Sequence, residues 1–315
     1  MNEHLYGKLK QAMVQFGKVD PDSVILAFAS GSRLHGARHE GEGDLDVAGA
    51  FIGRPHEELR LDSEDPKKGG HASASTSSDK RKNSKDDVDV KAYSLRRWAG
   101  LALKGNPAAL SFLFVPDEVR DMSVEPKCIW SCPTDEQQCE YPKCLTECPD
   151  FVGDNECKRR NREAHSLTAW DLFVLPNKGV FLASKHAKAF LGLGNDQFDR
   201  MTEKNWVRTH ISPVVPATQG YKSKPAMHMI RGMMEGIELL GTGTVTFPRP
   251  EKELLLDIKE GRMSLREILD LYKSLRDKLK EAEKRSPLPP ECDREAAGRL
   301  VADAMLWHWK LRGWT

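Results

Sequence analysis

Two aspartates one residue apart, Asp44 and Asp46, stand in a segment whose alternation predicts a β-strand. Successive side chains of a strand point to opposite faces, so both carboxylates share one face and repel each other unless a cation lies between them. Mg²⁺ or Mn²⁺ suits such a site, because these ions prefer carboxylate, phosphate and water oxygens. Asp89 on the next expected strand is the predicted third ligand, with Asp87 as its competitor on the same face. These carboxylates predict a two-metal site for phosphoryl transfer, although an isolated Asp-x-Asp is more often a solvated turn.

A Gly-Ser turn precedes the paired aspartates by about a dozen residues. Gly31 lets the backbone approach a phosphate closely, Ser32 offers a hydroxyl, and the following N–H groups can face an anion. Arg33 and His35 are further donors beside this turn. Gly-Ser dipeptides are common in ordinary turns, but the order of buried strand, turn, paired aspartates and later carboxylate strand is far more restrictive. It favours a nucleotide-binding site.

The first 120 residues have the pattern of a small mixed sheet with helices. Residues 62–86 are rich in Lys, Ser, Gly and Asp and have no large apolar side chain, so a mobile loop is expected there. In the last expected helix of this part, Asn106 is the predicted cap and Pro107 the first residue. Strands are expected at 24–30, 44–52 and 87–94, and helices at 3–20, 95–105 and 106–114.

The chain after residue 165 has the periodicity of helices. Trp307 and Trp309 in the last of them are expected in the core rather than stacked on RNA bases, and Asp293 is its predicted cap. The resulting division is a catalytic lobe at 1–120, a cysteine-rich insertion at 121–165 and a helical C-terminal lobe at 166–315. The expected helices of that lobe are 181–192, 225–243, 264–286 and 293–314.

The balance of charge gives little guidance about partners. The 315 residues include 48 Lys and Arg against 47 Asp and Glu, so any attraction for polyanions must come from local clusters. No stretch approaches the roughly 18 to 20 apolar residues that span a bilayer, and the polar start lacks the apolar core of a signal peptide. A cytoplasmic protein without a membrane partner is therefore expected.

The motifs "GSRLHG…GDLDVAGAFI" and "DVDVKAYSLRRWAGLALKGNPAALSFLF" resemble the DNA polymerase β-like nucleotidyltransferase superfamily, more specifically the predicted nucleotidyltransferases associated with RNA repair. The likeness covers most of the chain outside the two polar insertions. It implies an α+β nucleotidyltransferase-like fold with a helical C-terminal lobe. It also implies that Gly31 and Ser32 hold a triphosphate, that Asp44 and Asp46 bind metal and that Asp89 is the third acidic residue. Transfer of NMP from an NTP, with ATP the expected donor and an RNA end one candidate acceptor, follows from the resemblance.

Three positions depart from the family pattern. Gly43 stands where relatives carry Ser, Ala48 precedes Gly49 where relatives have Arg-Gly, and Ser111 replaces a Glu after the Asn-Pro helix start. These changes leave the expected metal ligands in place. They motivate an alternative hypothesis, a nucleotide- or RNA-binding module that has kept the pocket and lost the chemistry.

A polar stripe runs along the expected helix at 225–243 and includes the residue just before it. At 100° per residue, Lys224, His228, Arg231, Glu235 and Glu238 fall on one side of this helix. A solvated, salt-bridged helix face is one interpretation. The resemblance favours the other, in which Lys224 and Arg231 bind phosphates and His228 positions or deprotonates a hydroxyl.

Six of the seven cysteines lie between residues 128 and 157. Cys128, Cys132, Cys144 and Cys148 have short spacings that suit a tetrahedral Zn²⁺ site, and His165 is a spare ligand. The spacing is not the more specific paired C-x-x-C pattern, so free thiols in the insertion are the alternative interpretation. A zinc-stabilised interaction protein is accordingly a third, weaker hypothesis.

Overall fold

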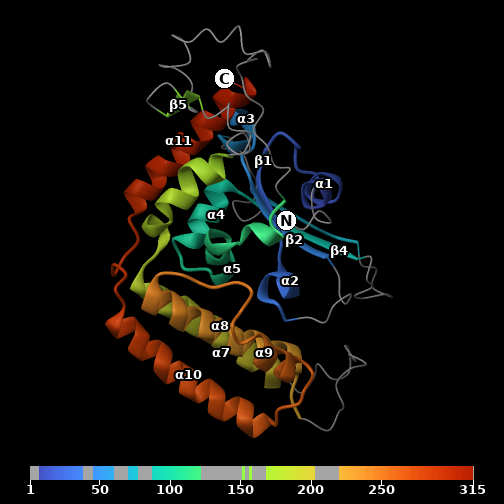
Figure 1. The fold of residues 1–315 in the computed structure, drawn as a ribbon, viewed down its shortest axis with the longest axis vertical. Coiled ribbons are helices and arrows are strands. Elements are labelled where there is room, and N and C mark those ends of the chain that lie inside the picture. Colours follow the sequence, from blue (N-terminus) through green and yellow to red (C-terminus); the bar gives the residue numbers. More distant parts are fainter. Residues whose placement is uncertain are drawn as a thin grey trace.

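A mixed four-stranded sheet and an extended set of helices make up the computed structural model (Figure 1). This architecture confirms the expected α+β class. No helix within the described ranges is long and apolar enough to cross a bilayer. The structure describes residues 7–37, 45–59, 70–76, 87–121, 151–152, 156–157, 168–202 and 220–314.

The sheet has the strand order β1-β2-β4-β3. Its central pair, β2 and β4, is parallel, and β1 and β3 pair antiparallel on the outer sides. The β-branched and small apolar residues of the first strand are buried along its whole length, as expected for a strand covered on both faces. The bounds are Val24–Ala29 for β1, Leu45–Phe51 for β2, His71–Ser75 for β3 and Val88–Ser94 for β4.

The edge strand β3 was not expected from the sequence. It occupies part of the segment 62–86 for which a mobile loop is predicted, and that prediction is wrong at His71–Ser75. The strand consists of Ala, Ser and His, so it has no apolar run that would signal a strand. Its alternation is nevertheless visible in the burial, because Ala72 and Ala74 are partly buried while the residues between them are exposed. Pairing with β4 fixes this segment.

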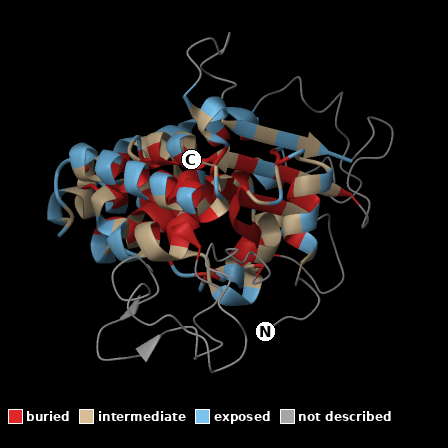
Figure 2. Cartoon of the chain, turned by 90° about the horizontal axis from the view of Figure 1, so that it is seen from above, coloured by how far each residue is buried: buried red, intermediate tan, exposed pale blue. Residues whose placement is uncertain are grey.

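Helices cover both faces of the sheet. On one face Met13 of α1 (Lys8–Gln15) packs with Val47 and Val90 of the two central strands. On the other face Ala48 packs in a larger cluster with Trp98 of α4 (Leu95–Ala102), and this cluster continues into the helical half of the chain. Figure 2 shows the buried residues gathered between the helices and the sheet, with the exposed residues outside.

One short helix near the sheet begins at its predicted cap. Asn106 Oδ1 accepts a hydrogen bond from Ala109 N at 3.1 Å, and Pro107 is the first residue of α5 (Pro107–Ser111). Both predictions for this helix are therefore confirmed. The remaining short elements are α2 (Gly31–His35), α3 (Pro55–Glu58) and the 3-10 turns Phe112–Phe114 and Asp117–Val119.

The helical half is organised around α8, which packs against α7, α9 and α10 (Figure 1). Asp293 caps the last helix, its side chain accepting a hydrogen bond from Ala296 N at 2.9 Å, as predicted. The helices are α7 (Ala187–Thr202), α8 (Ser223–Thr242), α9 (Lys252–Lys259), α10 (Leu265–Arg285) and α11 (Arg294–Arg312), preceded by a π turn at Trp170–Val174 and 3-10 turns at Leu175–Phe181 and Ser184–His186.

Helix α11 runs back from the helical half to the sheet, where its end lies near α3 (Figure 1). Trp309 is buried, and its Nε1 donates a hydrogen bond to the carbonyl oxygen of Gly53 at 2.8 Å, just beyond the end of β2. Trp307 is only partly buried and lies against Phe173, with ring centroids 5.9 Å apart. The prediction of core burial is confirmed for Trp309 and holds in part for Trp307.

We expect Trp309→Phe to lower the free energy of unfolding by about 1–3 kcal/mol, because it leaves the buried Gly53 carbonyl without its donor. Urea unfolding followed by circular dichroism measures this change. Trp307→Phe is the matched control, since it removes the same atoms from a partly exposed ring for which the described structure records no hydrogen bond. Equal losses in the two variants would contradict a role for the Trp309 hydrogen bond.

Candidate active site

The first component of the site is the close approach of Gly31 to Asp46. Gly31 begins α2 directly after β1 and has a positive φ of 60°. A Cβ atom at this position would overlap Oδ2 of Asp46. In addition, Ser30 N donates a hydrogen bond to the backbone oxygen of Asp46 at 2.8 Å. The Gly-Ser turn and the second aspartate of the pair are therefore in direct contact, and only glycine fits at position 31.

The second component is the pairing of Asp46 with Asp89. These residues are partners in the parallel ladder of β2 and β4, so their side chains leave the same face of neighbouring strands. Oδ1 of Asp89 is buried and has no hydrogen-bond partner in the described part of the structure. A buried carboxylate oxygen without a donor, beside a second carboxylate, fits a site that takes a cation.

The other predicted carboxylates are only partly accounted for. Asp44 lies outside the described residues, so its place as a third ligand stays a prediction. Among the residues that the structure describes, no group of three or more His, Cys, Asp or Glu side chains could hold a metal ion. Asp87, the competitor of Asp89, is buried at the start of β4, and its backbone oxygen accepts a hydrogen bond from Leu45 N at 2.8 Å.

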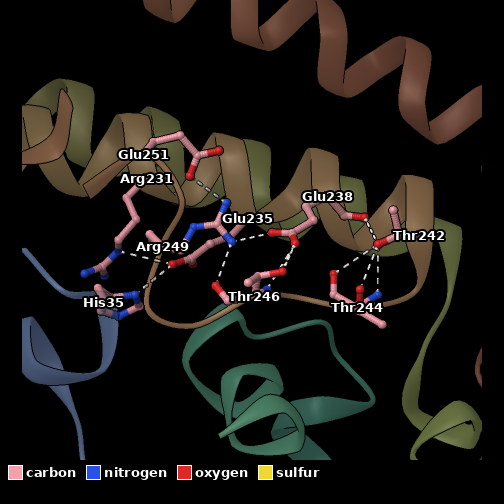
Figure 3. Close-up of polar contacts among 9 residues, drawn as sticks. All are labelled: His35, Arg231, Glu235, Glu238, Thr242, Thr244, Thr246, Arg249 and Glu251. Carbon is pink, nitrogen blue, oxygen red and sulfur yellow. Dashed lines mark hydrogen bonds and ion pairs between the residues drawn. The ribbon is translucent and has the colours of Figure 1, made fainter. Parts of the chain in front are cut away.

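The structure gives His35 a different role from the one expected beside the phosphate turn. Its side chain is buried at the end of α2, and Nδ1 lies 3.1 Å from Oε1 of Glu235 on α8 (Figure 3). Burial and the nearby Arg231 charge hold the pKa of His35 below its usual value despite this carboxylate, which favours the neutral imidazole. His35 thus connects the turn helix to the helical half.

Glu235 is the buried carboxylate at the centre of this connection. Its Oε1 also lies 3.4 Å from Nε of Arg231, one turn earlier on α8. Burial alone would raise the pKa of Glu235, but Arg231 and His35 outweigh it and the pKa is lowered, so the group is ionised. The stripe predicted on this helix is therefore a set of internal contacts at Glu235, and the interpretation as a wholly solvated face is wrong there.

Lys224, His228 and Arg231 lie on the side of α8 that is coupled to α2. Burial, followed by the charges of Arg231 and Lys224, lowers the pKa of His228 to about 3. His228 is consequently neutral near pH 7, the state that a hydrogen-bonding or proton-accepting imidazole requires. Lys224 is exposed, and the side chain of Arg231 keeps 17% of its surface accessible. These three residues, together with Ser32 and Arg33 on α2, remain predicted nucleotide-binding residues.

Arg249 fixes the other side of α2, and the sequence analysis missed it. Its guanidinium is 1% exposed and forms ion pairs with Glu238 on α8 and, at 3.0 Å, with Glu251 (Figure 3). Its backbone N donates a hydrogen bond to the His35 carbonyl oxygen at 3.1 Å. The only sequence signal was the unpaired acidic end of the stripe, at Glu238, with an arginine between two prolines a few residues later.

A family model described as the RNA repair pathway DNA polymerase beta family matches residues 1–128 and 165–301. The chain belongs to this family. The matched segments contain the Gly-Ser turn, the carboxylates of β2 and β4 and the polar stripe of α8. No curated protein and no solved structure was found to match the chain.

The residues between the two matched segments, 129–164, fall within the predicted cysteine-rich insertion. Two short strands, β5 (Phe151–Val152) and β6 (Glu156–Cys157), pair antiparallel in this part of the chain. Cys128, Cys132, Cys144, Cys148 and His165 lie outside the described residues. Zinc binding by the cysteines therefore stays a prediction.

We expect Gly31→Ala to displace the Asp46 carboxylate and to destabilise the fold by about 1–2 kcal/mol, because alanine is strained at this positive φ. Urea unfolding measures the stability, and Mg²⁺ titration of the unfolding midpoint measures the effect on the carboxylates. Gly100→Ala in α4 is the control, since its Cβ would meet no atom within 4 Å and should be neutral or slightly stabilising. Identical behaviour of the two variants would rule out the steric role of Gly31.

A pH prediction follows from His228. The unfolded chain titrates this histidine near pH 6.5 and the folded chain at about 3, so stability falls as the pH drops through this window. We expect His228→Gln to remove about 2 kcal/mol of the stability difference between pH 7.5 and pH 5. Urea unfolding at the two pH values tests it, and an unchanged difference in the variant would contradict it. Comparing each protein with itself across pH cancels any general destabilisation by the substitution.

Proposed function

We propose that this chain is a metal-dependent nucleotidyltransferase that transfers NMP from an NTP to a hydroxyl acceptor, with an RNA end as the favoured acceptor. The observation that carries the proposal is the contact of the Gly31 turn with Asp46, beside Asp89 in the next strand. Membership of a polymerase beta family in RNA repair supports the same reaction class.

The residues present fit a divalent metal. Asp46 and Asp89, with Asp44 as the predicted third ligand, would hold Mg²⁺ or Mn²⁺, and the buried Oδ1 of Asp89 is an oxygen that still needs a partner. When bound, the metal supplies positive charge that offsets the charge of the triphosphate and of the attacking oxygen. The two carboxylates are held at neighbouring positions of a ladder, so the site is preorganised by the backbone.

The remaining groups act on the triphosphate and the acceptor. The turn at Gly31 and Ser32 would offer backbone N–H groups and a hydroxyl to phosphate oxygens. Arg33, Lys224 and Arg231 add positive charge, and the neutral His228 can accept or donate one hydrogen bond. In the reaction the acceptor hydroxyl gives up its proton to water and its oxygen attacks the α-phosphorus. The bond between the α-phosphorus and the oxygen that bridges to the β-phosphate breaks, and pyrophosphate leaves with that oxygen. ATP is the proposed donor, as the resemblance suggests.

The alternative proposal, an inactive nucleotide- or RNA-binding module, has one supporting observation in the described structure. Ser111, at the position where relatives carry Glu, donates its hydroxyl to the carbonyl oxygen of Ala108 in its own helix at 2.8 Å. This side chain therefore forms a hydrogen bond within the last turn of α5, and a carboxylate that relatives have is missing here. A module of this kind would bind ATP and release no pyrophosphate.

We expect wild type to transfer label from α-³²P-labelled ATP to RNA in the presence of Mg²⁺ or Mn²⁺, and Asp46→Asn or Asp89→Asn to lose at least about a hundredfold of this activity. CTP, GTP and UTP are compared in parallel, with total RNA and total protein as acceptors. Asp303→Asn, an exposed aspartate on α11, is the matched control and should retain activity.

The result separates the two proposals. Near-normal transfer by either site variant would overturn the assigned metal ligands. Absence of label in every reaction, together with ATP-induced thermal stabilisation of the same preparation, would establish the binding module instead.

A further inference from the structure

Three strands present aligned side chains on the face that carries the two carboxylates. In the ladder Asp46 pairs with Asp89, and Asp89 pairs with Ser75 of the edge strand β3. Two residues further along β4, Lys91 pairs with Ser73 of β3, and two residues beyond that, Tyr93 pairs with His71. Because the side-chain period of a strand is two, these rows share one face and lead away from the carboxylates.

The outer part of this face is accessible. His71, Ser73 and Lys91 are exposed, whereas Ala48, beside Lys91 on β2, is buried in the core under the helices. The face is therefore covered over the middle of the sheet and open along β3 and the adjoining part of β4. We name His71, Ser73, Lys91 and Tyr93 the edge strip.

The edge strip combines an aromatic pair with positive charge. The rings of His71 and Tyr93 are stacked, with centroids 5.1 Å apart and an angle of 23° between their planes. Lys91 lies in the next row, and Arg97 of α4 is close enough that its charge, after burial, is the largest influence lowering the pKa of His71. The neutral, exposed His71 ring is stacked on Tyr93, and Lys91 and Arg97 lie nearby. Such a ring can stack with a nucleobase while the cations attract the adjoining phosphate.

The edge strip lies where a bound acceptor would have its end at the carboxylates. The Gly31 turn contacts Asp46 on the β1 side of the carboxylates, and the edge strip begins on the opposite, β3 side. His71 and Tyr93 lie four residues along the ladder from Asp89, which corresponds to about 13 Å. An extended single strand covers such a distance with a small number of nucleotides, so its end would reach the carboxylates.

We propose that the edge strip binds the single-stranded end of an RNA acceptor, with a base stacked on His71 and a phosphate near Lys91. This inference rests on the proposed function, since it places the acceptor of that reaction. Stacking and charge, which every base and phosphate can satisfy, carry this recognition, so we expect binding to depend only weakly on sequence.

Fluorescence anisotropy with a 5′-labelled single-stranded RNA, measured without NTP, tests the proposal independently of catalysis. We expect His71→Ala to weaken binding about tenfold, in the range found for loss of one stacking side chain. Lys91→Gln should also weaken it and should lower the slope of log affinity against log salt by about 1. Lys280→Gln on α10, an exposed lysine of the helical half, is the charge-matched control and should bind as wild type.

The thermal stabilisation by ATP should be unchanged in His71→Ala and Lys91→Gln, because both residues lie on the acceptor side. Equal RNA affinity of wild type and both variants would overturn the proposal, as would failure of wild type to bind the RNA or loss of affinity in the Lys280 control as well. Loss of RNA affinity in the two variants of a chain that transfers no nucleotide would support the edge strip and count against the proposed reaction alone.

Discussion

The site depends on two carboxylates that the parallel pairing of β2 and β4 forces to lie side by side. Asp46 and Asp89 have no freedom to separate, because each is fixed in the ladder by backbone hydrogen bonds on both sides of its strand. A further constraint is Gly31, whose missing side chain leaves room for the Asp46 carboxylate. The backbone thus concentrates negative charge at one point and brings a turn rich in N–H groups next to it. That combination is costly for a protein with no ligand and favourable for one that binds a cation and a phosphate.

The helical half fixes the position of α2 through buried hydrogen bonds at His35, made by residues that also form ion pairs within that half. Glu235, Arg231 and Arg249 surround His35, which ends the helix that Gly31 begins. Buried ion pairs add little net stability, because the cost of removing charges from water offsets their attraction. Loss of the His35 contact would, however, leave the buried Glu235 carboxylate with one partner fewer, and this cost disfavours other orientations of α2. The polymerase-like sheet and the helices after it share one apolar cluster as well, which is consistent with this coupling.

Much of this fold follows from local sequence patterns, whereas the contacts between elements do not. Buried strands, the Asn106 and Asp293 caps and the helices α8, α10 and α11 were predictable from apolar periodicity and capping chemistry. Helix α9 was not predicted, and α7 begins at Ala187 where a helix was expected from residue 181. The strand β3 was not predictable, because its Ala, Ser and His residues gain their structure from pairing with β4. Periodicity likewise placed Glu235 on a polar stripe but gave no reason to pair it with His35, two hundred residues earlier in the chain. Register across strands, which places Asp46 beside Asp89, is a property of the assembled sheet.

The effect of a departure from the family pattern depends on where it lies in the structure. Ala48 stands where the resemblance expects an arginine, and it is buried one row beyond Asp46 on the same face of β2. Its partner in the ladder is Lys91 of β4, so the row that lacks the arginine still contains a cation, one strand away. This cation lies toward the open edge and the β3 side, along the path that the proposal assigns to the acceptor. The row therefore keeps a positive charge next to the row of the carboxylates, and the departure at Ala48 does not by itself favour an inactive protein.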